Sequence, residues 1–496
     1  MTHAGFIEPL LQDFKYGVRL LRLNPGFAAT AILSLALGIA ANTSIFTLLD
    51  QVILRLLPVE NPRELVQFRM EGGRVGSQNG DGLHTFSYPM YVAFRDQNTV
   101  FSGLTGQYAE RLSLVAADRG ELVETGWVAA NFFHVLGVKP FIGRVLTADD
   151  DRQGGGAPVV VLQYDFWQSR FGGQHDVLGS TVRLNGSPFT VIGVTAPEFG
   201  GTNAGLLTQL WAPVTAKTLM TPTWAEDLKN ERSHWFYLFA RLKPGMTIER
   251  AQASMRVLHD QRKQEEVQGE FFTKFPDTKD RFLRQPLSIV PADRGLSALR
   301  GTFERPLVVL QWLVGMVLLI ACTNVAGLLL ARSAARQREI AIRGALGASR
   351  AHVIRQLFVE STILAIAGGI VGLLLSMALT QGLVRFLPYD RTVISLSAAP
   401  DARILLFTTA VTFAAAFVFG LLPAFRGSQV PPSATLKETA GAVIGGHVRL
   451  RKAFIALQVS LSLLLLIGAG LFVRTLDNLR RVDLGRVDLS LGSPGR

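Results

Sequence analysis

RSAARQREIAIRGALGASRAHVIR, residues Arg332 to Arg355, is a basic segment that lies between two long apolar stretches. It contains six arginines and one acid, Glu339. Its apolar residues recur at partly helical spacing, as at Ile342 and Leu346, which predicts an amphipathic helix. A charged helix between two membrane spans lies at the membrane surface, where one face is open to a cytoplasmic partner. The simpler alternative is a basic anchor that has no partner.

The composition predicts a membrane protein. Of its 496 residues, 48% are hydrophobic and only 18% are charged, which is a low charged fraction for a soluble chain. Five long apolar stretches could each cross a bilayer core of about 30 Å, which needs about 20 helical residues. In lipid the backbone must satisfy its own hydrogen bonds, so these stretches are expected to be helices. The predicted spans are 23–49, 306–331, 356–384 (free of charge from Ser361), 404–425 and 453–473.

The distribution of Lys and Arg predicts the orientation of the chain. The basic parts are an interfacial amphipathic helix at 1–22, the segment 332–355 and a linker at 426–452, and all three lie in the cytoplasm if the N-terminus does. The region 50–305, the loop 385–403 and the tail 474–496 then lie outside a bacterial inner membrane. The net charge of +12 reflects this topology and attraction to anionic membrane lipids. Nucleic-acid binding is the weaker alternative, because no recognition motif accompanies the charge.

The region 50–305 mixes strand and helix signals, so the fold class is a membrane α-helical protein with a large α+β extracytoplasmic domain. Asn185-Gly186 is a strong hairpin turn signal between two strands. The only cysteine is Cys322, so this region has no disulfides and depends on its core. Strands are predicted at Val159–Leu162, Thr181–Leu184, Phe189–Val194 and Trp235–Leu242, and helices at Tyr88–Gln97 and Ile248 to about Gln264.

Nothing in the sequence predicts an enzyme, a metal site or a cofactor. The histidines follow no HExxH pattern, and neither G-x-S-x-G nor the nucleotide-binding G-x-x-x-x-G-K-[ST] occurs. The acidic run Asp149 to Asp151 is expected to be a solvated turn, with calcium binding as the alternative. Four tryptophans are expected to lie in the core: Trp127, Trp167, Trp211 and Trp235.

Small and polar residues within the spans indicate helix packing. Asn42 and Asn324 are expected to form hydrogen bonds between helices, and Gly368 and Gly372 to allow close helix approach. No ionisable residue lies in the middle of a span, which argues against an ion-coupled transporter.

The segment 336–369, RQREIAIRGALGASRAHVIRQLFVESTILAIAGG, resembles the permease subunits of the MacB, LolCE and FtsX class of ABC transporters. In that family the E-I-A-x-R-x-A-L-G-A-S-R pattern forms the cytoplasmic coupling helix, which places Glu339, Arg343, Gly347 and Arg350 in contact with an ATPase. The start, DFKYGVRLLRLNPGF, resembles the duplicated permeases of acidobacteria.

The resemblance implies a MacB-like periplasmic core with an inserted lobe at 157–213, an ABC ATPase as a separate partner, and a dimer or pseudo-dimer of permease halves that serves export or efflux. Because few residues follow the last span, the chain is expected to be a truncated copy of a double-length permease. Two other functions remain: a mechanotransmitting scaffold that regulates an external partner, and a membrane-anchored enzyme.

Overall fold

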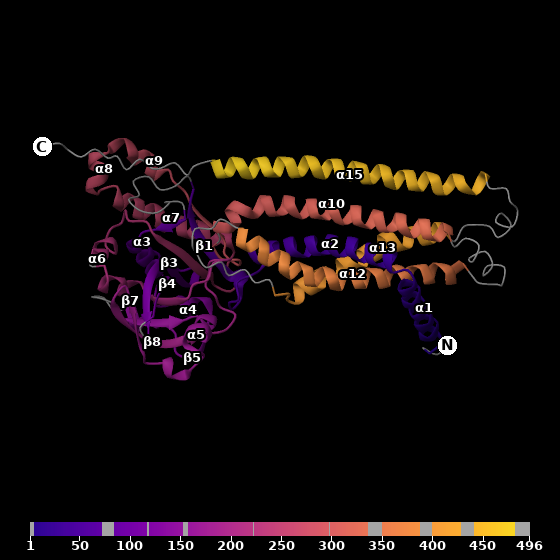
Figure 1. Cartoon of the computed structure of the whole chain (residues 1–496). Coiled ribbons are helices and arrows are strands. Elements are labelled where there is room, and N and C mark those ends of the chain that lie inside the picture. Colours follow the sequence, from indigo (N-terminus) through magenta and orange to yellow (C-terminus); the bar gives the residue numbers. More distant parts are fainter. Residues whose placement is uncertain are drawn as a thin grey trace. The chain divides into compact units, whose positions relative to one another are not determined.

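The structure is a computed structural model that describes residues 4–71, 84–116, 119–151, 157–221, 223–296, 298–335, 350–386, 399–427 and 441–481. The chain forms two compact units. We call the residues from Gln51 to Leu299 the sheet unit. The long helices before and after it form the helical unit (Figure 1).

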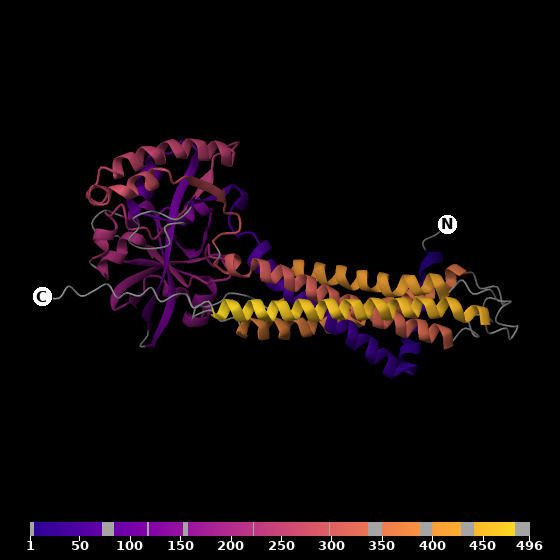
Figure 2. The same ribbon diagram turned by 90° about the horizontal axis from the view of Figure 1, so that it is seen from above.

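Among its described residues the helical unit contains six helices: α1 (Ala4–Leu23), α2 (Pro25–Leu49), α10 (Ala298–Ala335), α12 (Arg350–Phe386), α13 (Ala402–Gly427) and α15 (Gly441–Arg481). In Figure 1 α2, α10, α12 and α15 run along a common direction and α1 leaves them at an angle, whereas Figure 2 shows that α2 crosses the other long helices obliquely. Pro25 separates α1 from α2, because proline suits the first turn of a helix and disrupts its interior.

Four helices are long and apolar enough to cross a membrane, over Pro25–Leu54, Phe303–Arg332, Ile354–Val384 and Lys452–Leu471. A shorter apolar stretch, Ala402–Phe417, lies in α13. The sequence predicts a fifth span there, at 404–425. By length and hydropathy, the described residues support four spans and this shorter helix.

Helix α2 lies at the centre of the helical unit. Its side chains Ala31, Leu35 and Ile39 are fully buried, and they share one core with residues of α10, α12 and α13. Beyond Leu49 the helix continues as a π-helical turn, Asp50–Leu54. The carboxylate of Asp50 is buried there and lies 3.5 Å from Arg403 Nη1 at the start of α13.

The described residues of the sheet unit form one eleven-stranded sheet. The order of its strands is β11-β1-β10-β3-β4-β9-β6-β8-β5, with β2 beside β10 and β7 beside both β3 and β8. The strands are β1 (Leu65–Met70), β2 (Thr85–Phe86), β3 (Phe101–Ala116), β4 (Arg119–Val128), β5 (Pro140–Gly143), β6 (Val159–Leu162), β7 (Thr181–Leu184), β8 (Ser187–Thr195), β9 (Leu210–Pro213), β10 (Phe236–Leu242) and β11 (Leu287–Pro291).

Both faces of this sheet are buried. Val160 and Val161 are neighbours on β6, yet they belong to two different hydrophobic cores, because successive side chains of a strand point to opposite faces. The predicted core tryptophans are confirmed, since Trp127, Trp167, Trp211 and Trp235 are all at most 4% exposed.

Helices and short helical turns cover the sheet. The α-helices are α3 (Tyr88–Gln97), α4 (Phe132–Leu136), α5 (Tyr164–Phe171), α6 (Trp224–Asp227), α7 (Ile248–Glu266), α8 (Glu270–Lys274) and α9 (Lys279–Leu283). The 3-10 turns are η2 (Pro62–Glu64), η3 (Ala148–Asp151), η4 (His175–Val177), η5 (Val214–Leu219) and η6 (Pro276–Thr278).

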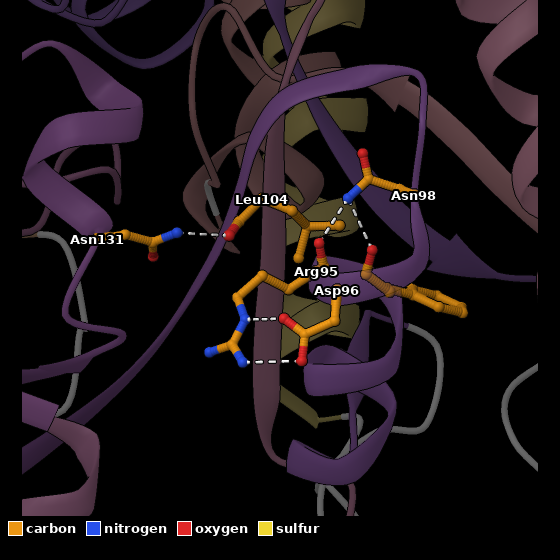
Figure 3. A network of polar contacts seen from close by, with 6 residues as sticks. Arg95, Asp96, Asn98, Leu104 and Asn131 are labelled. Atoms are coloured by element: carbon orange, nitrogen blue, oxygen red, sulfur yellow. Dashed lines mark hydrogen bonds and ion pairs between the residues drawn. The ribbon is translucent and has the colours of Figure 1, made fainter. Parts of the chain in front are cut away.

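Local polar contacts fix where α3 ends and where the next strand begins (Figure 3). The Asn98 side chain donates to the carbonyl oxygens of Phe94 at 2.8 Å and Arg95 at 2.9 Å, which satisfies acceptors that the last helical turn leaves open. Asn98 also accepts from the backbone N–H of Phe101, the first residue of β3. One asparagine therefore joins α3 to the longest strand.

The predicted hairpin at Asn185-Gly186 is confirmed. Both residues have positive φ, 45° and 87°, as a tight two-residue hairpin turn requires. The segment 157–213, expected to be an inserted lobe, has no sheet of its own. Its strands extend the main sheet, with β9 parallel to β4 and β7 antiparallel to β3.

The first and last residues of the sheet unit lie together. The Leu57 N–H donates to the Asp293 carbonyl at 2.8 Å, and the Arg294 side chain donates to the Ile53 carbonyl at 3.1 Å. Hydrogen bonds therefore hold together the two ends of the sheet unit, which follow α2 and precede α10 in the sequence.

Candidate coupling site at the helix ends

The basic segment that opened the sequence analysis begins at the end of α10 and ends within α12. Its middle, 336–349, lies outside the described residues, and with it lie Glu339, Arg343 and Gly347. Arg350 is the first residue of α12. The structure therefore describes the two ends of the segment, at Arg332 and Arg355.

Arg332 forms a buried ion pair. Its Nη1 lies 2.9 Å from Glu360 Oε1, and the two side chains are 13% and 5% exposed. The guanidinium also lies over the ring of Phe27 in α2, 4.5 Å from the ring centroid, a favourable cation–π distance. This pair joins the end of α10 to α12, and its arginine contacts α2.

Arg355 forms a second ion pair at the other end of the segment. Its Nε lies 2.7 Å from Asp13 Oδ2 of α1, and the aspartate side chain is only 8% exposed. One helical turn beyond Asp13, Gly17 is buried against Ile363 of α12. Both ends of the basic segment are therefore tied by ion pairs, one through Phe27 to α2 and the other to α1.

Sequence reasoning missed Asp13 and Glu360. Glu360 immediately precedes the charge-free stretch that begins at Ser361, and it lies inside the apolar helix Ile354–Val384. The sequence did offer a signal for Glu360: it is a single acidic residue at the start of an apolar stretch, after a loop with arginines at both ends. Ionisable residues within a membrane helix mark function more often than anchoring.

Polar side chains of α2 bond to three neighbouring helices. The Asn42 amide donates to the Val314 carbonyl of α10 at 2.7 Å. Ser44 donates to the Ser376 carbonyl of α12 at 3.1 Å, and the Thr43 and Thr408 hydroxyls lie 3.2 Å apart. Asn324, in contrast, is exposed on α10.

Gly368 and Gly372 lie where α12 crosses α2. A Cβ built on Gly368 would be 2.8 Å from Leu35 Cβ, and one built on Gly372 would be 3.0 Å from the Ala36 carbonyl oxygen. Such contacts leave no room for a side chain. The two glycines therefore bring together helices of the same chain.

The sheet unit brings no catalytic or metal-binding set together among its described residues. No three potential metal ligands of the described chain lie close to one another. One largely buried charged pair is Lys217 and Glu110, 2.6 Å apart, with the ammonium 3.7 Å from the Trp224 ring centroid. Burial lowers the pKa of Lys217, although Glu110 opposes this. These contacts join η5 to β3, which is a structural role.

The prediction of a solvated turn at Asp149 to Asp151 fits the exposed Asp149, but it is wrong for Asp150 and Asp151. Asp150 is 3% exposed and accepts from both terminal nitrogens of Arg144, at 2.7 and 2.9 Å. Asp151 accepts from the Thr215 hydroxyl. The run folds inward because Arg144 and Thr215 supply donors that compensate for the loss of water.

Asp151 supplies a test of this burial. Burial is the largest cause that raises the pKa of Asp151, so its charge costs stability at neutral pH, and this cost disappears as the pH falls below the ordinary carboxyl range. We expect Asp151→Asn to raise the melting temperature of the sheet unit by a few degrees near neutral pH. The gain should shrink on acidification.

Tryptophan fluorescence would measure this melting, since Trp312 is the only tryptophan outside the sheet unit and can be replaced by Phe. The control is Asp149→Asn, at an exposed neighbouring carboxylate. A gain that stays the same at every pH would show that burial of the charge is not its cause.

Two family profiles match successive parts of this chain. The profile of the MacB-like periplasmic core domain matches residues 28–258, and that of the FtsX-like permease C-terminal domain matches residues 312–432. This chain is an ABC transporter permease of the MacB/FtsX family. The sheet unit is accordingly its extracytoplasmic domain, and permeases of this family work with ATPase partners.

Several curated relatives are similar over most of the permease. The macrolide export ATP-binding/permease protein MacB of Chromobacterium violaceum is 25% identical over 431 residues, which cover 86% of this chain and 60% of that protein. MacB of Salmonella typhi is 25% identical over 368 residues, 73% of this chain and 50% of that protein. The permease therefore spans only about half the length of the curated relatives it matches.

Solved structures of extracytoplasmic domains are similar to part of this chain. The periplasmic region of MacB from Actinobacillus actinomycetemcomitans is 20% identical and covers 49% of this chain and 96% of that one, with a TM-score of 0.33. The extracellular domain of the ABC-type transporter YknZ from Gram-positive bacteria is 10% identical, covers 46% and 99%, and has a TM-score of 0.32.

Proposed function

We propose that this permease exports a substrate by transmitting the motion of a separate ABC ATPase to its extracytoplasmic domain. The ATPase contacts the cytoplasmic basic segment, with Glu339, Arg343, Gly347 and Arg350 as its contact residues. ATP is bound by that partner. The segments 1–22, 332–355 and 426–452 face the cytoplasm across a bacterial inner membrane, and α1 lies in the lipid interface.

The observation that carries this proposal is that an ion pair lies at each end of the basic segment. Arg332–Glu360, with Phe27, holds the end of α10 against α12 and α2. Arg355–Asp13 holds the start of α12 against α1. A force on the segment is therefore passed to α2 and α10, instead of being absorbed by separation of α10 from α12. In the sequence α2 leads directly into the extracytoplasmic domain, and α10 follows directly after it.

The polar and small residues of the helices have matching roles in this proposal. Gly368, Gly372 and Asn42 hold α12 and α10 to the central helix α2. Asn324 is exposed, so we assign it to the surface that meets a second permease half in a dimer or pseudo-dimer. Two copies would let one ATPase dimer move two extracytoplasmic domains.

Charge reversal at Arg343 and Arg350 tests the coupling role. We expect Arg343→Glu with Arg350→Glu to weaken association with the ATPase at least about tenfold, since each reversed contact with a complementary surface costs on the order of 1 kcal/mol or more. The measurement is binding of the purified ATPase to the permease in lipid nanodiscs, together with ATP hydrolysis stimulated by the permease.

The control is Lys15→Glu with Arg19→Glu, which reverses two exposed charges on α1, on the proposed cytoplasmic side. A plain basic anchor predicts that both double variants behave alike, and that outcome would contradict the proposal. A functional ATPase contact without any transported molecule, but with an external protein partner, would instead identify a mechanotransmitting scaffold.

A further inference from the structure

Helix α10 is buried along only one half of its length. In the described stretch from 303 to 320 no side chain of α10 is buried. In its second half Ala321, Cys322, Val325 and Ala326 are all buried, at 7% exposed or less. The first half follows the extracytoplasmic domain in the sequence, so α10 packs firmly at its cytoplasmic end and loosely at its outer end.

The place where α10 crosses α2 lies at the limit of this packed half. A Cβ built on Gly38 would be 3.2 Å from the Cα of Leu318 and 3.5 Å from Ala321 Cβ. The backbones can approach this closely only because residue 38 has no side chain. Beyond the crossing, toward the outer end, the contact between the helices becomes polar.

Asn42 makes that polar contact. Its amide nitrogen donates to the Val314 carbonyl at 2.7 Å and to the Gly38 carbonyl at 2.9 Å. Its amide oxygen accepts from Gln311 at 3.2 Å. Asn42 is only 4% exposed, so no water competes for these bonds, and one side chain spans the two helices on the outer side of the crossing.

Hydrogen bonds matter more here than apolar contact. Lipid tails are as apolar as leucine, so an apolar face of α10 gains little by remaining on α2, whereas a bonded amide loses its partners when the helices separate. The network is also incomplete, because Gln311 Oε1 is buried and has no hydrogen-bond partner among the described residues. An unpaired buried oxygen costs free energy, which makes the contact weaker than a fully satisfied network.

We propose that Asn42 is a positioning residue. Its hydrogen bonds to α10, which we call the pin, hold the outer half of α10 on α2 at the Gly38 crossing, and α10 turns about this contact during coupling. The proposal rests on the proposed function only for the source of the motion. The pin itself is a property of this chain alone, so it can be tested without an ATPase.

The test measures distances between spin labels in the full chain in nanodiscs. Cys322 is first replaced by Ala, which leaves no native cysteine. One label pair joins α10 to α2, at Val309 and Leu37, and the other joins α2 to α12, at Leu37 and Leu374. These three positions are 47%, 61% and 63% exposed, so labels there leave the core intact.

We expect Asn42→Leu to raise the ratio of separated to crossed conformers of the α10–α2 pair about 3- to 20-fold, as the loss of one or two interhelical hydrogen bonds implies. The α2–α12 distances should stay unchanged. Gln311→Leu removes one of the bonds and should give a smaller rise. The control Gln381→Leu makes the matching change at an exposed amide of α12 and should have no effect.

Two results would overturn the proposal. Unchanged α10–α2 distances in Asn42→Leu would show that the amide holds nothing in place. Equal broadening of both label pairs would show a general packing role. Addition of the ATPase with ATP should populate the separated conformers in the native chain, and this response should be lost when Arg343 and Arg350 are reversed. Failure of that step alone would contradict the proposed function and leave the pin intact.

Discussion

Replacement of Glu360 by leucine is expected to lower the free energy of unfolding of the helical unit by about 3–5 kcal/mol, because it leaves Arg332 charged and without its carboxylate in a buried site. The Arg332 side chain is only 13% exposed, so solvent compensates little. The measurement is unfolding of the permease in mixed micelles by increasing concentrations of denaturing detergent.

The double variant Arg332→Met with Glu360→Leu separates the pair from its parts. Both charges are then absent, and we expect most of the stability to return, since apolar replacements of a buried pair are often neutral. Glu270→Gln is the exposed control, because its pair with Lys274 is more than half exposed on both sides and contributes little. A single Glu360 variant as stable as this control would refute a buried pair.

That double variant also separates stability from coupling. If the ion pair transmits force, the double variant should be stable yet show weaker stimulation of ATP hydrolysis, since this ion pair no longer joins α10 to α12. A double variant with native stimulation would show that the pair stabilises the fold and does nothing more.

Replacement of Gly372 by valine is expected to destabilise the contact of α12 with α2 by about 3 kcal/mol, at the upper end of the cost of overpacking. The added Cβ would lie 3.0 Å from both the Ala36 carbonyl oxygen and Ile39 Cβ. The backbone oxygen cannot move without moving α2, so the two helices must separate. The melting temperature of the permease in nanodiscs measures this loss.

Gly382 provides a matched control on the same helix. A Cβ built there meets no atom within 4 Å, so Gly382→Val makes the same chemical change without a clash. We expect its melting temperature to stay near that of the native chain. Equal effects of the two substitutions would mean that helix propensity, and not close approach, accounts for the loss.

Local patterns in the sequence predicted local structure well. The strand at Val159–Leu162 and the helix at Tyr88–Gln97 have the predicted bounds, because each depends on its own residues and on nearby turns. Thr247 caps α7 by accepting from the Arg250 N–H. This bond uses the backbone N–H, so it forms whatever the side chain at 250.

Features that depend on distant partners were not predictable from the sequence. Asp13 and Arg355 are 342 residues apart, and neither residue indicates the other. The acidic run was misjudged for the same reason, since Asp151 turns inward only because Thr215 lies opposite. Gly368 and Gly372 indicated a close helix contact, but not that the partner is α2. For Arg343 and Gly347 the sequence motif is still the only guide.

The central position of α2 means that some of its hydrogen-bond partners are synthesised long after α2 itself. The hydrogen bond between Ser44 and Ser376 spans 332 residues, and the contact between Thr43 and Thr408 spans 365. At bacterial translation rates α2 therefore enters the bilayer roughly 15 to 70 s before these partners exist. During that interval the extracytoplasmic domain, whose ends meet before α10 begins, can fold completely. Until then Asn42 and Ser44 can donate to the carbonyls of Gly38 and Ala40, four residues earlier in their own helix.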